Sequence, residues 1–300
     1  TYKVTHTSAA SGSTSGGGGT GNANYQINIG ETASTFGYGW GTDTWSTSTW
    51  DTPRSSSDVT VFARNWSLDN FGEDLIATVL NGGTYIKDIS GSIDARATAL
   101  SNAPTASRFS LVSTDTRHLL IFGTETTIGT AASQDDLFFR FSDREDATDY
   151  TPVATNEAGS LRISDGSRIM GAVKSSGQIL VWTDTSLQGI QFVGTPFTFG
   201  MRQLGANCGL IAQHAAIEVN GKAFWMSDNS FYMYDGVVKK MPCSVQDYVF
   251  DDLSYTNRND IACGINTAFN EIIWYYPSAN ATAIDRAVAY NYLENTWYTL

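Results

Sequence analysis

Short apolar runs separated by turn signals follow one another along the chain, and residues 216–241 show this pattern most completely. Three turns divide the stretch into four runs: Asn220-Gly221, Ser227-Asp228-Asn229 and Asp235-Gly236. Asn-Gly and Asp-Gly favour tight hairpin turns because their residues tolerate positive φ angles. Pro242 ends the fourth run, since proline cannot donate a hydrogen bond to a strand ladder. The stretch therefore predicts four short antiparallel strands.

The two inner runs of this stretch are apolar at successive positions. Phe224-Trp225-Met226 and residues 231–234 would present apolar side chains to both faces of a sheet, whereas a sheet with one face in water alternates. Such a sheet is stable only with a neighbour stacked on each side. This is the requirement of a β-propeller blade.

Short apolar runs separated by turn residues recur along most of the chain. We expect the strand after each first hairpin turn to start near Gly83, Asp136, Gly177, Gly221 and Asn270. These markers are 53, 41, 44 and 49 residues apart, and an apolar run precedes each of them. A drifting period of this size with several short strands per repeat is typical of a propeller. We predict an all-β protein in which residues 59–300 form a β-propeller of four-stranded antiparallel blades, with five repeat units and long inter-blade loops.

One short helix is expected between two blades, over residues 244–253. Ser244 would be its N-cap, and Asp247 stands three residues further on.

Residues 1–58 form a Gly-, Ser-, Thr- and Trp-rich segment, which we expect to be extended and to pack on the propeller or contribute strands to it. Its glycine run is followed by Asn22 rather than by the Lys of a phosphate-binding loop. Trp40, Trp45 and Trp50 recur every five residues. They are either packing anchors of a long loop or a stacking platform for sugars or bases.

Six tryptophans are predicted packing anchors because a buried indole contributes a large apolar area. They are Trp40, Trp66, Trp182, Trp225, Trp274 and Trp297.

The charge balance argues against tight binding of nucleic acid. Over 300 residues the chain has 30 Asp and Glu against 18 Lys and Arg, for a formal net charge of -12. Phosphate contacts need clustered cations, and Lys239-Lys240 is the only adjacent basic pair. No apolar run is long enough for a transmembrane helix. Three cysteines match no metal motif, and we expect them to be reduced.

Candidate catalytic residues are few. The three histidines have no metal-type spacing, and the Gly-x-Ser-x-Gly nucleophile motif does not occur. Ser113-Thr114-Asp115 begins a match to the sialidase aspartate box, but Arg117 replaces its glycine. The acidic cluster at residues 143–149 could be a Ca²⁺ site or a solvated loop. We therefore expect a non-enzymatic protein with no cofactor and no bound metal.

Several motifs, read in order along residues 37–300, resemble those of a family of tailed-phage virion proteins. They are Gly39-Trp40-Gly41, residues 66–77 (WSLDNFGEDLIA), Cys208-Gly209-Leu210-Ile211, Phe224-Trp225-Met226-Ser227, Tyr232 to Gly236, Val249-Phe250-Asp251-Asp252 and Asn270-Glu271-Ile272-Ile273-Trp274. The family is that of β-propeller tail hub, nozzle or stabilisation proteins of short-tailed bacteriophages.

The resemblance implies a structural protein of the phage tail that assembles in the host cytoplasm and ends up in the virion. By analogy with the family it would form a ring, expected to be a hexamer, below the portal and its adaptor and next to other tail proteins. Genomic DNA would pass through this ring during ejection without tight binding. Carboxylate-rich loops would then face the channel or an interface, through Asp135, Asp136, Asp143, Glu145, Asp146 and Asp149.

A second interpretation is a carbohydrate-binding or glycan-cleaving β-propeller used in host recognition. Trp40, Trp45 and Trp50 would be its sugar platform.

Overall fold

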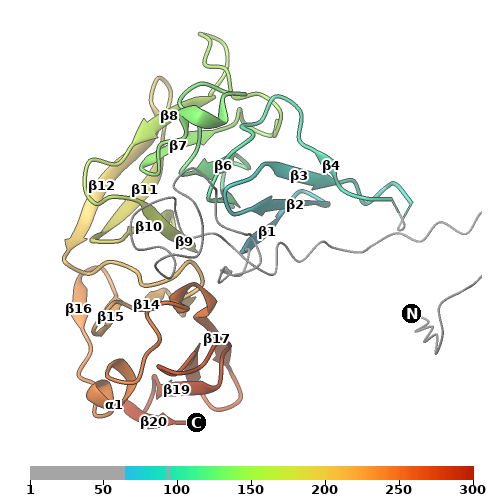
Figure 1. Ribbon diagram of the computed structural model, residues 1–300. Helices are drawn as coiled ribbons and strands as arrows, with labels where there is room; N and C mark the ends of the chain where they lie inside the picture. Colours follow the sequence, from blue (N-terminus) through green and yellow to red (C-terminus); the bar gives the residue numbers. More distant parts are fainter. Residues whose placement is uncertain (1–64, 93–94) are drawn as a thin grey trace, which may run out of the picture.

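The computed structural model describes residues 65–92 and 95–300 (Figure 1). The predicted segment 1–58, with Trp40, Trp45 and Trp50, lies outside the described residues.

The described chain consists of five four-stranded antiparallel sheets, each built from four consecutive strands (Figure 1). Sheet 1 contains β1 (Trp66–Phe71), β2 (Asp74–Val79), β3 (Thr84–Lys87) and β4 (Thr98–Ala99). Sheet 2 contains β5 (Phe109–Val112), β6 (Leu119–Phe122), β7 (Phe138–Phe141) and β8 (Gly159–Arg162). Sheet 3 contains β9 (Ile169–Ser175), β10 (Gln178–Thr183), β11 (Ser186–Gly194) and β12 (Thr198–Ala206). Sheet 4 contains β13 (Ala216–Val219), β14 (Lys222–Met226), β15 (Phe231–Tyr234) and β16 (Val238–Lys240). Sheet 5 contains β17 (Ala262–Asn266), β18 (Glu271–Tyr276), β19 (Arg286–Asn291) and β20 (Thr296–Thr299).

The sheets are arranged as propeller blades. Figure 1 shows them following one another along an arc, with β9 toward its centre and β12 and β16 on its outer side. First strands of neighbouring sheets pack together: β1 against β5, and β13 against both β9 and β17. The predicted all-β propeller of four-stranded antiparallel blades is therefore confirmed.

Sheet 4 follows the sequence pattern closely. Val219 pairs with Lys222 across the first turn, in which both Asn220 (φ 53°) and Gly221 (φ 78°) have positive φ. Two successive positive φ angles define a type I′ hairpin turn. The predicted strands 216–219 and 222–226 match β13 and β14 in full.

The repeat markers are wrong for the first two sheets. Gly83 and Asp136 precede the third strands, β3 and β7, whereas the other three markers precede second strands. In sheet 1 the first strand contains Ser67 and Asp69, so it does not form an apolar run. In sheet 2 the first strand, β5, is not among the predicted runs. The described residues contain five four-stranded sheets, and the assignment of strands within the first two expected repeats is shifted.

The predicted helix is shorter than expected. It is α1 (Gln246–Phe250), and its N-cap is Val245, without a side-chain capping bond, rather than Ser244. The helix ends early because the backbone after it pairs with another segment: Leu253 forms a β-bridge with Ser278. Two 3₁₀ turns, η2 (Ala131–Ser133) and η3 (Arg258–Asp260), complete the described helical structure.

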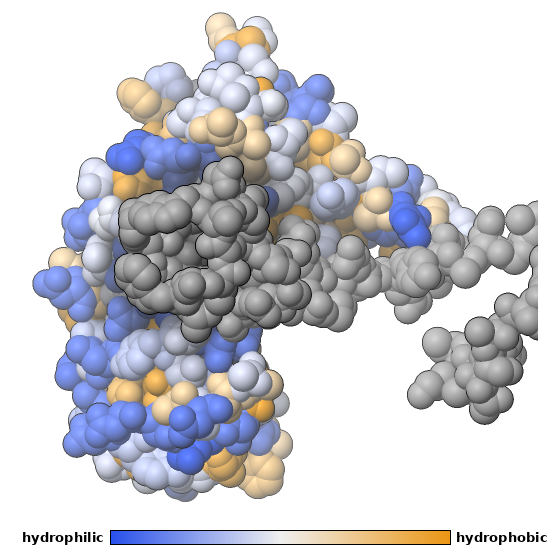
Figure 2. Space-filling model, viewed as in Figure 1, coloured by the Kyte–Doolittle hydropathy of each residue, from blue (hydrophilic) through white to orange (hydrophobic). Residues whose placement is uncertain are grey.

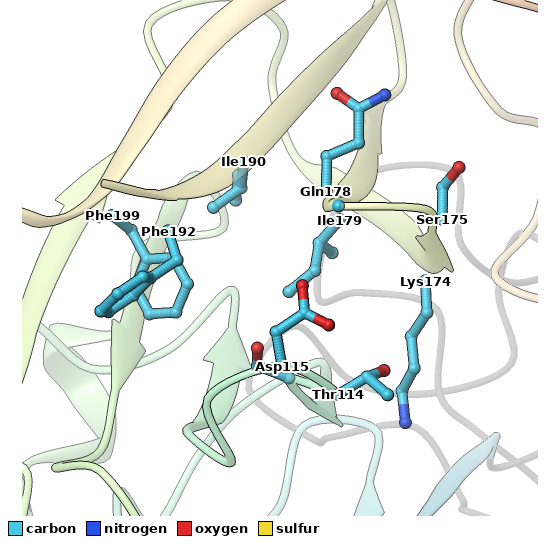
Figure 3. Close-up of a pocket in the computed structure, with 11 residues that line it drawn as sticks. Thr114, Asp115, Lys174, Ser175, Gln178, Ile179, Ile190, Phe192 and Phe199 are labelled. Atoms are coloured by element: carbon cyan, nitrogen blue, oxygen red, sulfur yellow. The ribbon is translucent and has the colours of Figure 1, made fainter. Parts of the chain in front are cut away.

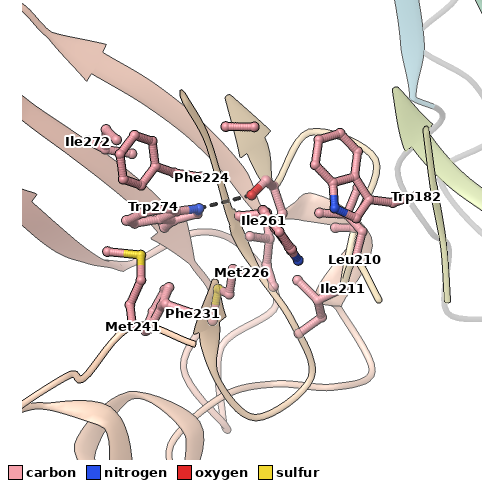
Figure 4. Close-up of a cluster of buried hydrophobic side chains, with 14 of the residues drawn as sticks. Trp182, Leu210, Ile211, Phe224, Met226, Phe231, Met241, Ile261, Ile272 and Trp274 are labelled. Carbon is pink, nitrogen blue, oxygen red and sulfur yellow. Dashed lines mark hydrogen bonds between the residues drawn. The ribbon is translucent and has the colours of Figure 1, made fainter. Parts of the chain in front are cut away.

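Three buried clusters hold the sheets together. The largest connects sheets 3, 4 and 5 and includes Trp182, Trp225 and Trp274, each at 0% exposure on the second strand of its sheet (Figure 4). The indole N–H of Trp274 donates to the Ala215 carbonyl at 2.9 Å, and that of Trp225 donates to the Cys208 carbonyl at 2.9 Å. Smaller clusters join sheet 2 to sheet 3 and sheet 1 to sheet 2. Of the other predicted anchors, Trp66 and Trp297 are half-buried.

All three cysteines lie in the described chain as free thiols. Burial raises the pKa of Cys208 to about 11 and that of Cys263 to about 12, and it raises the pKa of Cys243 as well. We expect thiol titration under denaturing, non-reducing conditions to return all three. In the folded protein Cys243 should react first, because the other two pKa values leave very little thiolate. Recovery of fewer than three thiols would contradict the free-cysteine arrangement.

Candidate functional site

The innermost strands of the first three sheets meet in one polar contact. Lys174, on β9, places Nζ 2.7 Å from Oδ2 and 2.8 Å from Oδ1 of Asp69, on β1. The Val112 N–H, at the end of β5, donates to the same Asp69 Oδ2 at 2.7 Å. One carboxylate thus connects sheets 1, 2 and 3. Sequence patterns could not predict this contact, because Asp69 and Lys174 are 105 residues apart.

A small hollow adjoins this contact, where sheets 2 and 3 meet (Figure 3). Its volume is about 30 Å³. Its walls are Ser113, Thr114, Asp115, Lys174, Ser175, Gly177, Gln178, Ile179, Ile190, Phe192 and Phe199. A space of this size holds about one water molecule. It has no room for a sugar ring or a nucleotide.

Next to this hollow, a hydroxyl, an imidazole and a carboxylate contact one another in a row. The Thr116 hydroxyl is 2.7 Å from His118 Nδ1, and His118 Nε2 is 3.4 Å from Glu157 Oε2. Ser113 Oγ is 3.0 Å from the Thr116 hydroxyl. This order resembles that of a nucleophile, its base and the group that orients the base.

The environment of these groups gives them a structural role instead. His118 is 0% exposed and Thr116 is 6% exposed. The rings of Phe192 and Phe199, from sheet 3, lie 5.9 and 5.1 Å from the imidazole. Thr116 is not among the residues that line the hollow. The contacts instead join the β5–β6 turn to the segment before β8. Phe192 and Phe199 of sheet 3 cover them. Sequence spacing could not reveal this, because Glu157 is far from His118 along the chain.

The buried imidazole predicts a pH dependence of stability. Burial is the main cause that lowers the pKa of His118 below its ordinary value of 6.5, although Glu157 opposes the shift. The folded state therefore keeps His118 neutral where the unfolded chain would protonate it. Stability is fully present above about pH 6.5 and falls as the pH drops toward the folded pKa, by at most about 1.4 kcal/mol per pH unit for one proton.

Urea unfolding at pH 7.5 and pH 5.5 checks this expectation. The loss of stability on acidification should be smaller in His118→Gln than in the parent protein. Burial also lowers the pKa of His214. The variant His214→Gln should therefore also lose less stability between pH 7.5 and pH 5.5 than the parent protein. An unchanged pH dependence in the His118 variant would contradict a neutral, buried His118.

The aspartate-box match lies in the β5–β6 turn. Arg117, which replaces the glycine of that pattern, is exposed and has a φ of 51°, a left-handed conformation that glycine adopts more readily. The backbone thus keeps the turn geometry without the glycine. The indole that ends the pattern is replaced by Leu120.

Two of the six predicted channel or interface carboxylates have cationic partners. Asp135 Oδ2 is 2.6 Å from Arg162 Nε, and this contact is the main reason that the pKa of Asp135 is lowered. Asp136 Oδ2 is 3.4 Å from Arg108.

The other four carboxylates belong to the loop between β7 and β8. Asp143, Asp146 and Asp149 accept hydrogen bonds from nearby residues: Glu157 N at 2.7 Å, Thr148 N at 2.8 Å and Asn156 Nδ2 at 2.9 Å, respectively. Glu145 and Asp146 are exposed. The sequence therefore located an acidic surface loop, in which three carboxylates also hold the loop together.

Within residues 65–92 and 95–300, no three His, Cys, Asp or Glu side chains are grouped closely enough to hold a metal ion. No helix in the same part of the chain has the length and apolarity that a membrane crossing requires. Figure 2 shows hydrophilic residues over much of the described surface in that view, with hydrophobic residues in separate small areas.

A second hollow, of about 210 Å³, lies between sheets 4 and 5. It is lined by Met233, Lys239, Lys240, Met241, Pro242, Tyr290 and Asn295. Lys239 is engaged by Asp235 at 2.7 Å, and both lysines are exposed at the rim.

Neither a known protein family nor a curated protein matches this sequence. Among solved structures, the chain is similar to the computationally designed Ika8 protein, with 8% identity, a TM-score of 0.47, and coverage of 79% of this chain and 61% of that one. It is also similar to BamB from Moraxella catarrhalis, with 9% identity, a TM-score of 0.43, and coverage of 80% and 62%. Dihydro-heme d1 dehydrogenase NirN matches with 10% identity, a TM-score of 0.46, and coverage of 80% and 47%. The chain thus spans less than two thirds of the length of these proteins, and no functional argument follows from likenesses this distant.

Proposed function

We propose that this protein is a structural component of a short bacteriophage tail, a hub or nozzle protein that forms a ring around the DNA ejection channel. The ordered series of motifs over residues 37–300 carries this proposal. Within the described chain several of these motifs lie in strands: residues 66–77 cover β1 and most of β2, residues 224–226 lie in β14, and residues 271–274 lie in β18. The resemblance thus concerns the parts that build the blades.

The site chemistry favours a structural role over catalysis. The hydroxyl, imidazole and carboxylate groups around His118 are buried between two sheets, and the adjoining hollow has room for about one water molecule. Cations are scattered and several are engaged by carboxylates, as Arg108, Arg162 and Lys174 are. We infer that such a protein acts through its surfaces and their charge rather than through a catalytic site.

The negative charge suits a channel through which DNA slides. A basic wall would gain affinity from counterion release at each phosphate it neutralised, and the DNA would stick. An acidic wall avoids this. The exposed Glu145, in the β7–β8 loop, is the carboxylate we assign to this wall.

A DNA titration with charge-reversed variants tests the proposal. The parent protein should bind duplex DNA negligibly at moderate salt. Glu145→Lys should increase DNA retention, because a ring repeats the substitution in every subunit. The matched control is Glu294→Lys, another exposed glutamate, in the β19–β20 turn of sheet 5, which should leave DNA binding near the parent level.

Three outcomes would count against this mechanism. Tight, salt-sensitive binding by the parent protein would overturn the passive channel. Equal effects of the two variants would remove Glu145 from the channel wall. Specific retention on a glycan array, with or without hydrolysis, would favour the carbohydrate-directed interpretation.

A further inference from the structure

The first and last sheets differ from the three between them in how their faces are covered. In sheets 2 and 4 the second strands are buried at successive positions, Leu119–Phe122 and Ala223–Met226, as expected for sheets packed on both faces. In sheet 5 burial alternates along β18: Ile272, Trp274 and Tyr276 are at 0% exposure, whereas Tyr275 is 41% exposed. One face of sheet 5 is therefore covered by sheet 4, and the other is not covered by any described sheet.

Burial also alternates along β2 of sheet 1, where the exposed face is the one that points away from sheet 2. Ile76 is buried at 0% exposure toward sheet 2, whereas its neighbour Leu75 is 38% exposed. Leu68, which pairs with Ala77 and so shares the face of Leu75, is 64% exposed. Trp66 and Tyr85 are also on this face, with ring centroids 6.3 Å apart.

Both uncovered faces expose apolar side chains beside polar ones. On this face of sheet 5, Tyr275 and Tyr298 are 41% and 37% exposed and Ile273 is partly exposed, whereas the paired Ala287 and Ala289 are buried. A Cβ added at Gly264, on the same face, would meet no atom within 4 Å. Exposed aromatic and aliphatic side chains on two sheet faces are typical of surfaces that pack against something else.

The start of the described chain lies between these two sheets. The side-chain amide of Asn65 donates to the Asn259 carbonyl at 3.0 Å. Asn65 directly precedes β1 of sheet 1, and Asn259 lies in η3, which leads into β17 of sheet 5. The described chain therefore begins next to η3, the turn that leads into sheet 5.

The segment that ends at this point is long enough to cover both faces. It has 64 residues, whereas the whole of sheet 4 is made from residues 216–240. It also supplies large apolar side chains, including Trp40, Trp45 and Trp50. Apolar side chains on a tethered segment bind nearby apolar faces at high effective concentration.

We propose that residues 1–64 pack between the uncovered faces of sheets 1 and 5 and bury Leu68, Leu75 and Tyr275. This inference is independent of the proposed tail function. It assigns the tryptophans of the segment to packing within the chain, so they would not form an exposed sugar platform.

Site-specific photo-crosslinking of the 300-residue chain tests the proposal. Benzoylphenylalanine replaces Tyr275 in one variant and Leu68 in another, and the protein is a mixture of isotopically light and heavy copies. We expect both variants to crosslink to peptides of residues 1–64 of the same copy. The control replaces Tyr248, which is 54% exposed on α1, and should give no such crosslink.

Crosslinks between light and heavy copies would overturn the proposal in favour of a second copy as the cover. The absence of crosslinks would overturn it in favour of open faces.

A steric test gives a second measurement. Gly264→Trp should lower the melting temperature by several degrees if residues 1–64 fill the space beside it, whereas Gly264→Ala should be tolerated. An unchanged melting temperature in Gly264→Trp would contradict a packed cover at this position.

Discussion

Replacement of Trp225 by Ala is expected to lower the free energy of unfolding by about 3–5 kcal/mol. Trp225 is 0% exposed, and its ring contacts those of Trp182 and Tyr232, with centroids 5.3 and 5.7 Å apart. Truncation removes these contacts and leaves a cavity in the cluster that joins sheets 3, 4 and 5. The Cys208 carbonyl also loses its indole donor. Denaturant unfolding measures the loss, and a wild-type midpoint would show that Trp225 does not support the blades.

Two conservative variants separate the packing of this indole from its hydrogen bond. Trp225→Phe removes the N–H that satisfies the Cys208 carbonyl. Trp182→Phe removes an indole N–H that has no partner. Both lose similar volume, so Trp225→Phe should be the more destabilising by about 1–2 kcal/mol. Equal losses would mean that the bond to Cys208 contributes nothing.

Replacement of Asp69 by Ala is expected to destabilise the protein by about 1–3 kcal/mol, because it leaves Lys174 and the Val112 N–H without their shared acceptor. Asp69 is partly exposed, with 19% of its side chain accessible, so water compensates part of the loss. Asp69→Asn keeps an acceptor for the Val112 N–H and should lose less. Urea unfolding of the two variants measures both effects.

The matched control for this pair is Asp136→Ala. Asp136 lies 3.4 Å from Arg108, which is 16% exposed, but Asp136 itself is 41% exposed, so water compensates more of its loss than at Asp69. If Asp136→Ala and Asp69→Ala were equally destabilising, the link among the first three sheets would have no special role.

The sequence was most informative where tight-turn residues flank a continuous apolar run. Turn residues and continuous apolar runs located both strands of the β13–β14 hairpin, because tight turns depend on the residues within them. The pattern failed at β1, where Ser67 and Asp69 interrupt the apolar run. Asp69 is polar because it bonds residues of sheets 2 and 3. A polar residue within a strand does not reveal which residues of other sheets it will contact.

The candidate site shows the same limit. The sequence located the acidic loop at residues 143–149 but singled out none of the three histidines. It could not pair His118 with Glu157, or Asp69 with Lys174, because those partners meet only when the sheets stack. Nor could it show that the outward faces of the first and last sheets differ from those of the middle sheets.

The most direct test of the proposed ring is native mass spectrometry of the purified chain. We expect a closed cyclic oligomer, a hexamer, with about six times the subunit mass of 32.5 kDa. A single oligomeric species that persists on dilution would support the ring. A stable monomer at high protein concentration would contradict it.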